Sequence, residues 1–432
     1  MNDSLTTEAR SILSELWLGS ATKPAAHLYP HQWSWDSAFI AIGNRHIDWD
    51  RAALEMVTLF EAQWANGMVP HIVFSDSGET YFPNAQFWDV MAVCQYPPPK
   101  PSSGICQPPV HATAALRVYE ARPDAEGLRF LRDLYPKLLA WHDYLYRHRC
   151  VDSALAEIWH PWESGMDNSP AWDGLLAGLE FTSSEVPTYR RVDTEMIDGD
   201  DRPSDAEYDR YAYLVGALRS VGYEPRSPEH LPFRVRDVLF NSALARSEVD
   251  LAEIAALIGI DESSHIARAI GLATAIDQHL WNPASNFFHS QDANTERLIP
   301  SRISGGLMAL LMPLPSEQRG QLLQTMQSAF AVPVGDNGLL ALTAPEDEPG
   351  FDAVRYWRGP AWIQMNWLLA SGLDINGEHE MANRVRSGIV NIVTEAGFHE
   401  YFNPRTMRGH GTDRFGWTAA LLIDVLSTRE AS

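Results

Sequence analysis

Residues 124–146 read DAEGLRFLRDLYPKLLAWHDYLY, and this stretch shows the pattern that decides the fold class. Its leucines recur at spacings of three and four residues, which places them on one face of a helix. The same apolar spacing predicts helices over 206–220, 236–257, 264–280, 317–329, 379–394 and 415–426. Weaker helical patterns cover 35–47, 51–64, 84–93, 110–120, 302–312 and 362–373. Alternating strand patterns are short, as at 71–74 and 286–289, so the sequence predicts an all-α fold.

Three long Pro- and Gly-rich stretches interrupt these helices, at about 68–109, 159–203 and 335–360. Loops of this length inside a compact domain usually carry function. No linker, low-complexity segment or obvious repeat divides the chain, so residues 1–432 are expected to form one domain. About a dozen helices with long loops at one end indicate a single (α/α)6 barrel, with the loops roofing a central active site.

The composition excludes several classes of protein. A formal net charge of −23 argues against binding to nucleic acid or to anionic membranes, both of which need clustered Lys and Arg. Cys94, Cys106 and Cys150 are too few and too unevenly spaced for a disulfide framework or a zinc site. The first 20 residues lack the features of a secretory signal, and no apolar stretch is long enough to span a membrane. We therefore expect a cytoplasmic protein.

Fifteen tryptophans are the unusual feature of the composition, and several of them fall in four clusters. A tryptophan excess is typical either of a large helical core or of a pocket that stacks on flat-faced ligands such as sugar rings. The clusters are 29–36 (YPHQWSWD), 159–170 (WHPWESGMDNSP), 356–362 (YWRGPAW) and 397–404 (GFHEYFNP). Any one of them could be structural, with a Trp as a packing plug or an Asp as a helix cap. Three of them pair aromatic residues with a carboxylate, and together they favour a carbohydrate site.

Glycoside hydrolysis explains such a pairing, because it needs two carboxyl groups in different protonation states. One carboxyl group stays protonated and gives its proton to the leaving oxygen, while the other is ionised and activates water or attacks the anomeric carbon. Surrounding aromatic rings exclude water and raise the pKa of the acid by desolvation. They also stack on the C–H faces of the sugar.

These clusters resemble glycoside hydrolase family 63, in particular its bacterial branch of mannosylglycerate and glucosylglycerate hydrolases. The resemblance runs in order from about residue 29 to residue 421. The stretches that carry it are YPHQWSWDSAFIAIG, GMVPHIVF, GICQPPV, WESGMDNSP, DDRPSDAEYDRYAYL, YWRGPAWIQMNWLL and FHEYFNPRTMRGHGTDRFGWTAAL. The SGMDNSP and YWRGPAW elements are the most specific of them.

The resemblance implies an inverting α-glycosidase that releases a hexose and glycerate. By position in the motifs, Asp167 is the general acid, Glu400 is the general base acting through water, and Glu163 binds sugar or supports the site. The implied residues of the −1 sugar subsite are Trp33, Trp35, Asp36, Tyr356, Trp357 and Trp362. Those implied around the aglycone are Tyr29, Tyr81, Gln107, Arg202 and Tyr208. Arg202 suits a glycerate carboxylate by charge and fork geometry, although it could instead pair with Asp201 or Asp205.

Other functions stay open at this point. An α-glucosidase acting on a neutral oligosaccharide belongs to the same class, and a sugar isomerase or epimerase could use the same barrel. A non-catalytic sugar-binding protein is a further alternative. No metal-binding or phosphate-binding motif occurs, so no cofactor and no metal are expected, and the expected partner is a small-molecule glycoside. The choice between mannose and glucose, the oligomeric state (a homo-oligomer included) and closure of the long loops as a lid are not decided by the sequence.

Overall fold

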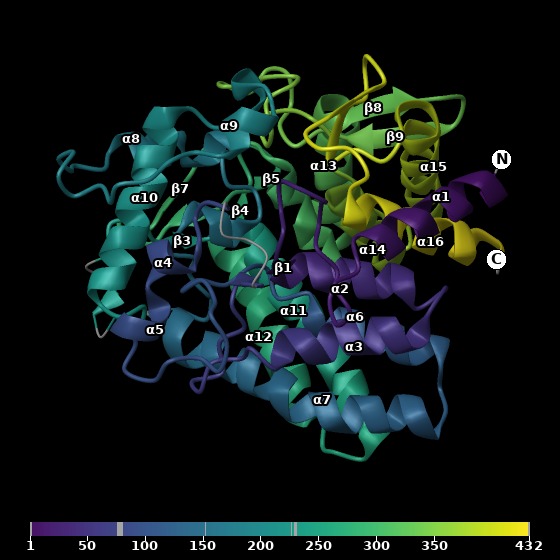
Figure 1. The fold of residues 1–432 in the computed structure, drawn as a ribbon. Coiled ribbons are helices and arrows are strands. Elements are labelled where there is room, and N and C mark those ends of the chain that lie inside the picture. The colour runs from purple at the N-terminus through teal and green to yellow at the C-terminus, as the bar shows by residue number, and fades with distance from the viewer. Residues whose placement is uncertain (1, 76–80, 152, 226, 229–230, 431–432) are drawn as a thin grey trace.

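The computed structural model describes residues 2–75, 81–151, 153–225, 227–228 and 231–430. Helices dominate it, as the apolar spacing predicts (Figure 1). The α-helices are α1 (Asn2–Glu15), α2 (Ser34–Asn44), α3 (Trp49–Phe60), α4 (Ala85–Trp88), α5 (Val90–Val93), α6 (His111–Ala121), α7 (Ala125–Tyr144), α8 (Asp173–Ala177), α9 (Asp193–Met196), α10 (Asp205–Ser220), α11 (Val238–Ile258), α12 (Ser263–Leu280), α13 (Ser316–Thr325), α14 (Ile363–Ile375), α15 (His379–Ala396) and α16 (Gly416–Glu430). Two short π-helices are η1 (Leu145–Arg149) and η7 (Met326–Phe330). The 3-10 helices are η2 (Pro161–Ser164), η3 (Pro170–Trp172), η4 (Gly199–Asp201) and η6 (Ser304–Leu311).

A closed circuit of helices surrounds the centre of the molecule. Helix α2 packs on α6, α6 on α11, α11 on η6, η6 on α14, α14 on α16, and α16 returns to α2. A second set lies outside this circuit: α3 and α7 pack behind α2, α6 and α11, α12 behind α11, α15 behind α14 and α16, and α1 behind α16. The first and last helices of the chain thus lie side by side (Figure 1).

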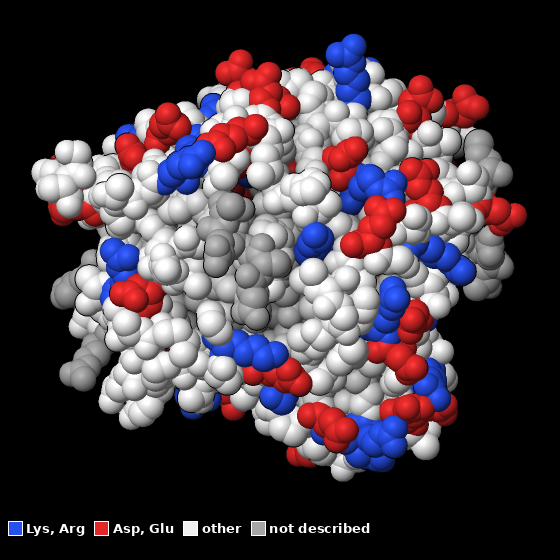
Figure 2. All heavy atoms as spheres, in the orientation of Figure 1, with Lys and Arg blue, Asp and Glu red and all other residues white. Residues whose placement is uncertain are grey.

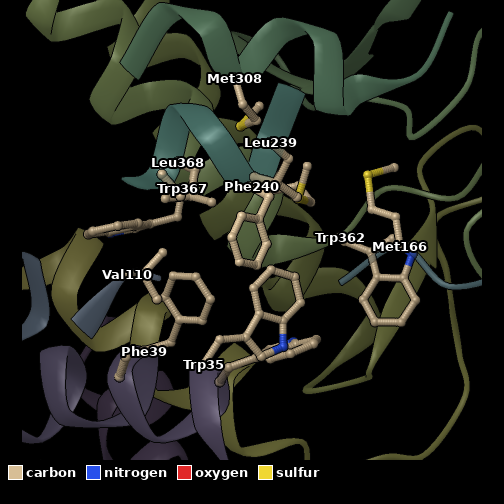
Figure 3. Packing of buried hydrophobic residues seen from close by; sticks show 14 of the residues in the cluster. Trp35, Phe39, Val110, Met166, Leu239, Phe240, Met308, Trp362, Trp367 and Leu368 are labelled. Atoms are coloured by element: carbon tan, nitrogen blue, oxygen red, sulfur yellow. The ribbon is translucent and has the colours of Figure 1, made fainter. Parts of the chain in front are cut away.

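The centre of this circuit is filled by large apolar side chains (Figure 3). Phe39 of α2 contacts Trp35 of the same helix and Trp367 of α14, at ring-centroid distances of 5.6 and 6.1 Å. Leu239 and Phe240 of α11 project toward them and are fully buried. Each such side chain contributes roughly 1.5–3 kcal/mol when it leaves water. Trp35, which lines the cavity described below, packs on this apolar layer.

Strands are short and occur mainly in hairpins that join the helices. They are β1 (Gln32–Trp33), β2 (Ile72–Val73), β3 (Val235–Arg236), β4 (Trp281–Asn282), β5 (Phe287–Phe288), β6 (Gln291–Asp292), β7 (Arg297–Leu298), β8 (Ala331–Val334), β9 (Gly338–Ala341), β10 (Tyr401–Asn403) and β11 (Arg408–His410). The pairs β1–β2, β4–β5, β8–β9 and β10–β11 and the three-stranded order β3–β6–β7 are all antiparallel. The strands expected at 71–74 and 286–289 correspond to β2 and β5.

Three segments differ from their predicted form. The helix expected over 84–93 is two short helices, because Asp89 between them has φ 54°, the left-handed conformation that ends a helix. The helix expected over 302–312 is the tighter 3-10 form of η6. The loop expected over 335–360 begins with β9, which pairs with β8 and packs on α15. The other two long loops hold only short elements, and residues 76–80 of the first lie outside the described part of the chain.

The surface carries acidic and basic side chains in small mixed groups on the face shown in Figure 2, without a continuous basic patch. None of the described helices has a long enough apolar stretch to cross a lipid bilayer. The described residues also contain no group of three or more His, Cys, Asp or Glu side chains placed to hold a metal ion.

Candidate active site

A cavity of about 100 Å³ opens where the amino-terminal ends of α2 and α16 meet the long loops. It is lined by residues that come from both halves of the sequence. Among the residues expected at the site, it brings together Tyr29, Trp33, Trp35, Asp36, Tyr81, Gln107, Asp167, Arg202, Tyr208, Tyr356, Trp357 and Glu400. The three long loops supply most of those that do not come from 29–36.

The segment 32–36 forms one wall of the cavity because it passes directly from β1 into the first turn of α2. Strand β1 pairs with β2, which fixes Trp33 opposite Ile72. The backbone N–H of Trp35 donates to Oε1 of Gln107 at 3.1 Å, which ties the start of α2 to the first long loop. Asp36 is buried in the first turn, and its pKa is raised well above the usual range because of that burial.

Asp167 lies on a tight turn that follows η2. Gly165 has φ 71°, and a Cβ there would lie 2.5 Å from the ring of Trp35, so this turn requires glycine. Tyr211 of α10 donates a hydrogen bond to the backbone carbonyl of Asp167 at 3.1 Å. The next residue, Asn168, accepts one from the backbone N–H of Trp357 at 3.0 Å. The turn is therefore fixed to α10 and to the third long loop at once.

Glu400 is placed by the β10–β11 hairpin. Its backbone N–H donates to the carbonyl of Thr412 at 2.9 Å, and the N–H of Thr412 lies 3.3 Å from Oε2 of Glu400. The hairpin pairs in turn with Ala361, through hydrogen bonds between Ala361 and Phe402 of 2.8 and 2.9 Å. On the other carboxylate oxygen, Tyr29 donates a hydrogen bond of 2.8 Å to Oε1.

The two carboxyl groups have different electrostatic surroundings. Burial raises the pKa of Asp167 to about 7, and the nearby charge of Glu400 adds to this effect while Arg202 opposes it. Burial also raises the pKa of Glu400, but Arg202, the hydrogen bond from Tyr29 and the N–H of Thr412 all favour its ionised form. Near neutral pH, Asp167 is thus the group of the two that is better suited to keep a proton.

Arg202 is a buried cation at the edge of the same cavity. Its Nε donates to Asp193 at 3.2 Å, and its Nη1 donates to the hydroxyl of Tyr29 at 3.1 Å. The pairings with Asp201 or Asp205 that its sequence neighbourhood allows are not formed, since Asp205 pairs with Arg191 instead. Its Nη2 has no hydrogen-bond acceptor among the described residues. The hydrogen bonds of Nη2 therefore remain available to a ligand.

Aromatic rings form the remaining walls. Trp357 lines the cavity and stacks face to face on Trp362, with centroids 3.7 Å apart and planes 6° apart. Trp362 stacks in turn on Tyr401 at 4.9 Å. On the side of Arg202, Tyr81 and Tyr208 complete the lining.

Two of the expected residues do not line the cavity. Trp362 lies behind Trp357, and Glu163 is fully buried in an ion pair with Arg149 of 2.7 Å. Glu163 also accepts hydrogen bonds from the backbone N–H groups of Cys106 and Trp159. Of its two expected roles, sugar binding or support, the geometry fits support of the loop that leads to Asp167.

The cavity also has lining residues that the site prediction missed: Pro24, His71, Pro83, Trp162, Gly165, Phe415 and Trp417. His71, Trp162, Gly165, Phe415 and Trp417 lie within the stretches that carry the family resemblance, so position in those motifs could have indicated them. Pro24 and Pro83 have no such signal. Burial lowers the pKa of His71 to about 3, so its imidazole is neutral.

The chain matches a known protein family over most of its length. A family model described as the mannosylglycerate hydrolase MGH1-like glycoside hydrolase domain matches residues 29–418. The chain is 43% identical to mannosylglycerate hydrolase of Rubrobacter radiotolerans over 429 residues, which cover 98% of this chain and 97% of that protein. It is 34% identical to glucosylglycerate hydrolase of Mycolicibacterium hassiacum, with 95% and 94% covered.

A solved structure agrees with these relatives. The mannosylglycerate hydrolase of Thermus thermophilus, a member of glycoside hydrolase family 63 crystallised with Tris and D-glycerate, superposes with a TM-score of 0.88 at 36% identity. The match covers 97% of this chain and 99% of the Thermus chain. The chain therefore belongs to the MGH1-like glycoside hydrolases of family 63 and is itself a glycoside hydrolase.

Proposed function

We propose that this enzyme hydrolyses an α-linked hexosylglycerate, mannosylglycerate or glucosylglycerate, to the hexose and glycerate with inversion at the anomeric carbon. The observation that carries the proposal is one cavity lined by two carboxyl groups, Asp167 and Glu400, and by the buried cation Arg202. The names of the relatives and the D-glycerate in the Thermus structure support it. We also propose that the closed circuit and its outer helices form a single-domain (α/α)6 barrel.

In the proposed reaction, Asp167 gives its proton to the glycosidic oxygen as the bond from that oxygen to the anomeric carbon breaks. A water molecule attacks the same carbon from the opposite face and passes its proton to Glu400. The products are the hexose of inverted configuration and glycerate. An inverting mechanism predicts that the two carboxyl groups lie roughly 6.5–9.5 Å apart, which leaves room for the water.

The sugar is proposed to bind between Trp33, Trp35, Trp357 and Tyr356, with Asp36 holding its hydroxyl groups. Trp362 contributes by fixing the plane of Trp357, which it stacks on. The aglycone is proposed to lie among Tyr29, Tyr81, Gln107, Arg202 and Tyr208. Its carboxylate would accept from Nη2 of Arg202, the nitrogen whose hydrogen bonds are not used within the described structure.

The testing experiment supplies both hexosylglycerates and a neutral α-glucoside to the purified enzyme and follows the products by NMR. The proposal expects glycerate and a hexose that appears first as the β-anomer. Asp167→Asn and Glu400→Gln should each lose at least ~10³-fold in kcat, the usual scale for removing an essential acid or base. Asp200→Asn is the matched control, because Asp200 is exposed in the same long loop as Asp167.

Retention of more than a few per cent of activity by either variant would remove that residue from its role. First appearance of the α-anomer would exclude inversion.

A neutral oligosaccharide as substrate is distinguished through Arg202. Replacing Arg202 by Ala should raise KM for a hexosylglycerate at least ~100-fold, since a charge-assisted, partly desolvated hydrogen bond is lost. The same variant should change KM for a neutral α-glucoside severalfold at most. Equal losses on both substrates would assign Arg202 to the structure of the cavity and not to the aglycone.

A further inference from the structure

Arg202 lies between the aglycone side of the cavity and the carboxylate of Glu400. Its Nη1 donates to the hydroxyl of Tyr29 at 3.1 Å, and that hydroxyl donates to Oε1 of Glu400 at 2.8 Å. The direct distance from Nη1 to Oε1 is 3.8 Å. The guanidinium also lies over the ring of Tyr356 at 4.2 Å, and the hydroxyl of Tyr356 is 3.3 Å from that of Tyr29. One cation therefore acts on Glu400 both directly and through Tyr29.

The opposite edge of the same guanidinium is held from outside the cavity. Asp193 accepts from Nε of Arg202 at 3.2 Å and forms an ion pair of 2.7 Å with Arg191. Arg191 in turn lies over the ring of Tyr208 at 4.3 Å. These contacts fix the plane of Arg202, so its two terminal nitrogens face different targets. Nη1 faces Tyr29 and Glu400, and Nη2 is left for the carboxylate of an aglycone.

We propose that an aglycone carboxylate bound at Arg202 activates Glu400 through the contact from Arg202 to Tyr29 to Glu400, so that the enzyme selects its substrate in kcat as well as in KM. This inference rests on the proposed function. With a neutral aglycone, the whole charge of Arg202 stabilises ionised Glu400 and makes it a weaker base. A carboxylate on Nη2 offsets that charge, and Glu400 then accepts the proton of the attacking water more readily. Tyr29 is a positioning residue in this scheme.

The charged and titratable groups that face Glu400 together set its pKa in the free enzyme. They are Asp36 on α2, Asp167 on the second long loop, Tyr29, Tyr356, Tyr401 and Arg202. Arg202, Tyr29 and Tyr356 join Glu400 to the proposed carboxylate site, and the hydrogen bonds from Arg202 to Glu400 run through Tyr29. A change of charge on the aglycone alone therefore tests their contact with Glu400 against a constant background.

The experiment compares a hexosylglycerate with the matching hexosylglyceramide, in which a neutral amide replaces the carboxylate. The acid limb of the kcat profile reports the base in the enzyme–substrate complex. Arg202 lies 3.8 Å from Glu400, and an opposite charge this close lowers a carboxyl pKa by about 1–3 units. Because the carboxylate of the glycerate substrate offsets part of that charge, we expect the acid limb for this substrate to lie about one pH unit higher. For a Brønsted coefficient of about 0.5, kcat on the plateau should be about threefold higher.

Variants separate this coupling from simple binding. Arg202→Ala should abolish the difference in the acid limb between the two substrates, and Tyr29→Phe should remove at least half of it. Tyr208→Phe is the matched control: its phenol lines the same cavity without a hydrogen bond to Glu400, so KM changes while the full difference persists. Thermal unfolding of each variant checks its fold, and the wild-type comparison decides the matter even if a variant does not fold.

The outcomes are distinct. Equal acid limbs and equal kcat for the two substrates, with a difference in KM alone, would overturn the coupling and leave the proposed function standing. Absence of hexose and glycerate from the hexosylglycerate would overturn the proposed function itself.

Discussion

The buried pair of Arg149 and Glu163 gives a sharp test of how the loop before Asp167 is held. The Glu163 side chain is 0% exposed and that of Arg149 is 1% exposed. Both carboxylate oxygens accept from the guanidinium, at 2.8 and 2.7 Å. Oε2 also accepts from the N–H of Trp159 at 2.6 Å, and Oε1 from that of Cys106 at 3.1 Å. Glu163→Gln removes the negative charge and turns an –NH₂ group toward these donors.

The expected loss follows from this burial. Breaking a buried ion pair by removing one partner costs about 3–5 kcal/mol, because a charge is left without compensation. The entropy of unfolding is about 2.1 cal/mol/K per residue, or about 0.9 kcal/mol/K for 432 residues. Dividing this free-energy loss by the entropy of unfolding, we expect Glu163→Gln to lower Tm by about 3–6 °C.

Differential scanning calorimetry measures this shift, with Glu195→Gln as the control. Glu195 pairs with Arg190 at the surface, where the Arg190 side chain is 80% exposed, and such pairs contribute about 0–1 kcal/mol. The Tm of the Glu195→Gln variant should therefore differ from that of the wild type by less than about 1 °C. If Glu163→Gln changed Tm no more than this control does, the role of Glu163 as the buried anchor of the loop would be refuted.

Four further predictions concern the cavity. The pKa of Asp167 near 7 predicts that kcat/KM falls as pH rises through about 7, because the acid must be protonated; a pH profile level to pH 9 would contradict this. Gly165→Ala should reduce kcat at least tenfold, since its Cβ would displace the ring of Trp35, as intrinsic fluorescence and kinetics can check. Trp357→Ala should cost about 3–5 kcal/mol in stability, measured by denaturant unfolding, because it leaves a void beside Trp362. Dialysis against EDTA should leave activity unchanged in a direct assay, and loss restored by a divalent metal would overturn the expectation of a metal-free site.

The apolar spacing predicts the long helices well because each one buries a stripe on its neighbours. The run at 264–280 is α12 (Ser263–Leu280), and the run at 206–220 is α10 (Asp205–Ser220). Contacts between residues that are remote in sequence explain the elements that the apolar spacing does not predict. Strands β8 and β9 form where Gly388 of α15 approaches Leu339 so closely that a Cβ would lie 2.2 Å from its carbonyl oxygen, and spacing along the chain carries no sign of that contact.

The candidate site is predictable as a set of clusters, but not in its internal arrangement. Aromatic clusters, three of them with a carboxylate, mark the four segments that meet at the cavity. They do not tell which way a carboxylate points. Glu163 and Asp167 share one motif, yet Glu163 turns into the protein because Arg149 lies in η1 directly beneath it. Arg202 likewise pairs with Asp193, nine residues away, in place of its nearer acidic neighbours.

The hydrogen bond from Tyr29 to Glu400 joins residues that are 371 positions apart. Helix α16, which follows Glu400, packs on α1 and α2 on either side of Tyr29 in the sequence. The proposed acid and base, Asp167 and Glu400, therefore come together only after the segment from Glu400 to α16 has docked on α1 and α2. We therefore expect the proposed hydrolysis to require this docking. Recovery of activity after dilution from denaturant should accordingly report the final docking event, later than the return of helical signal.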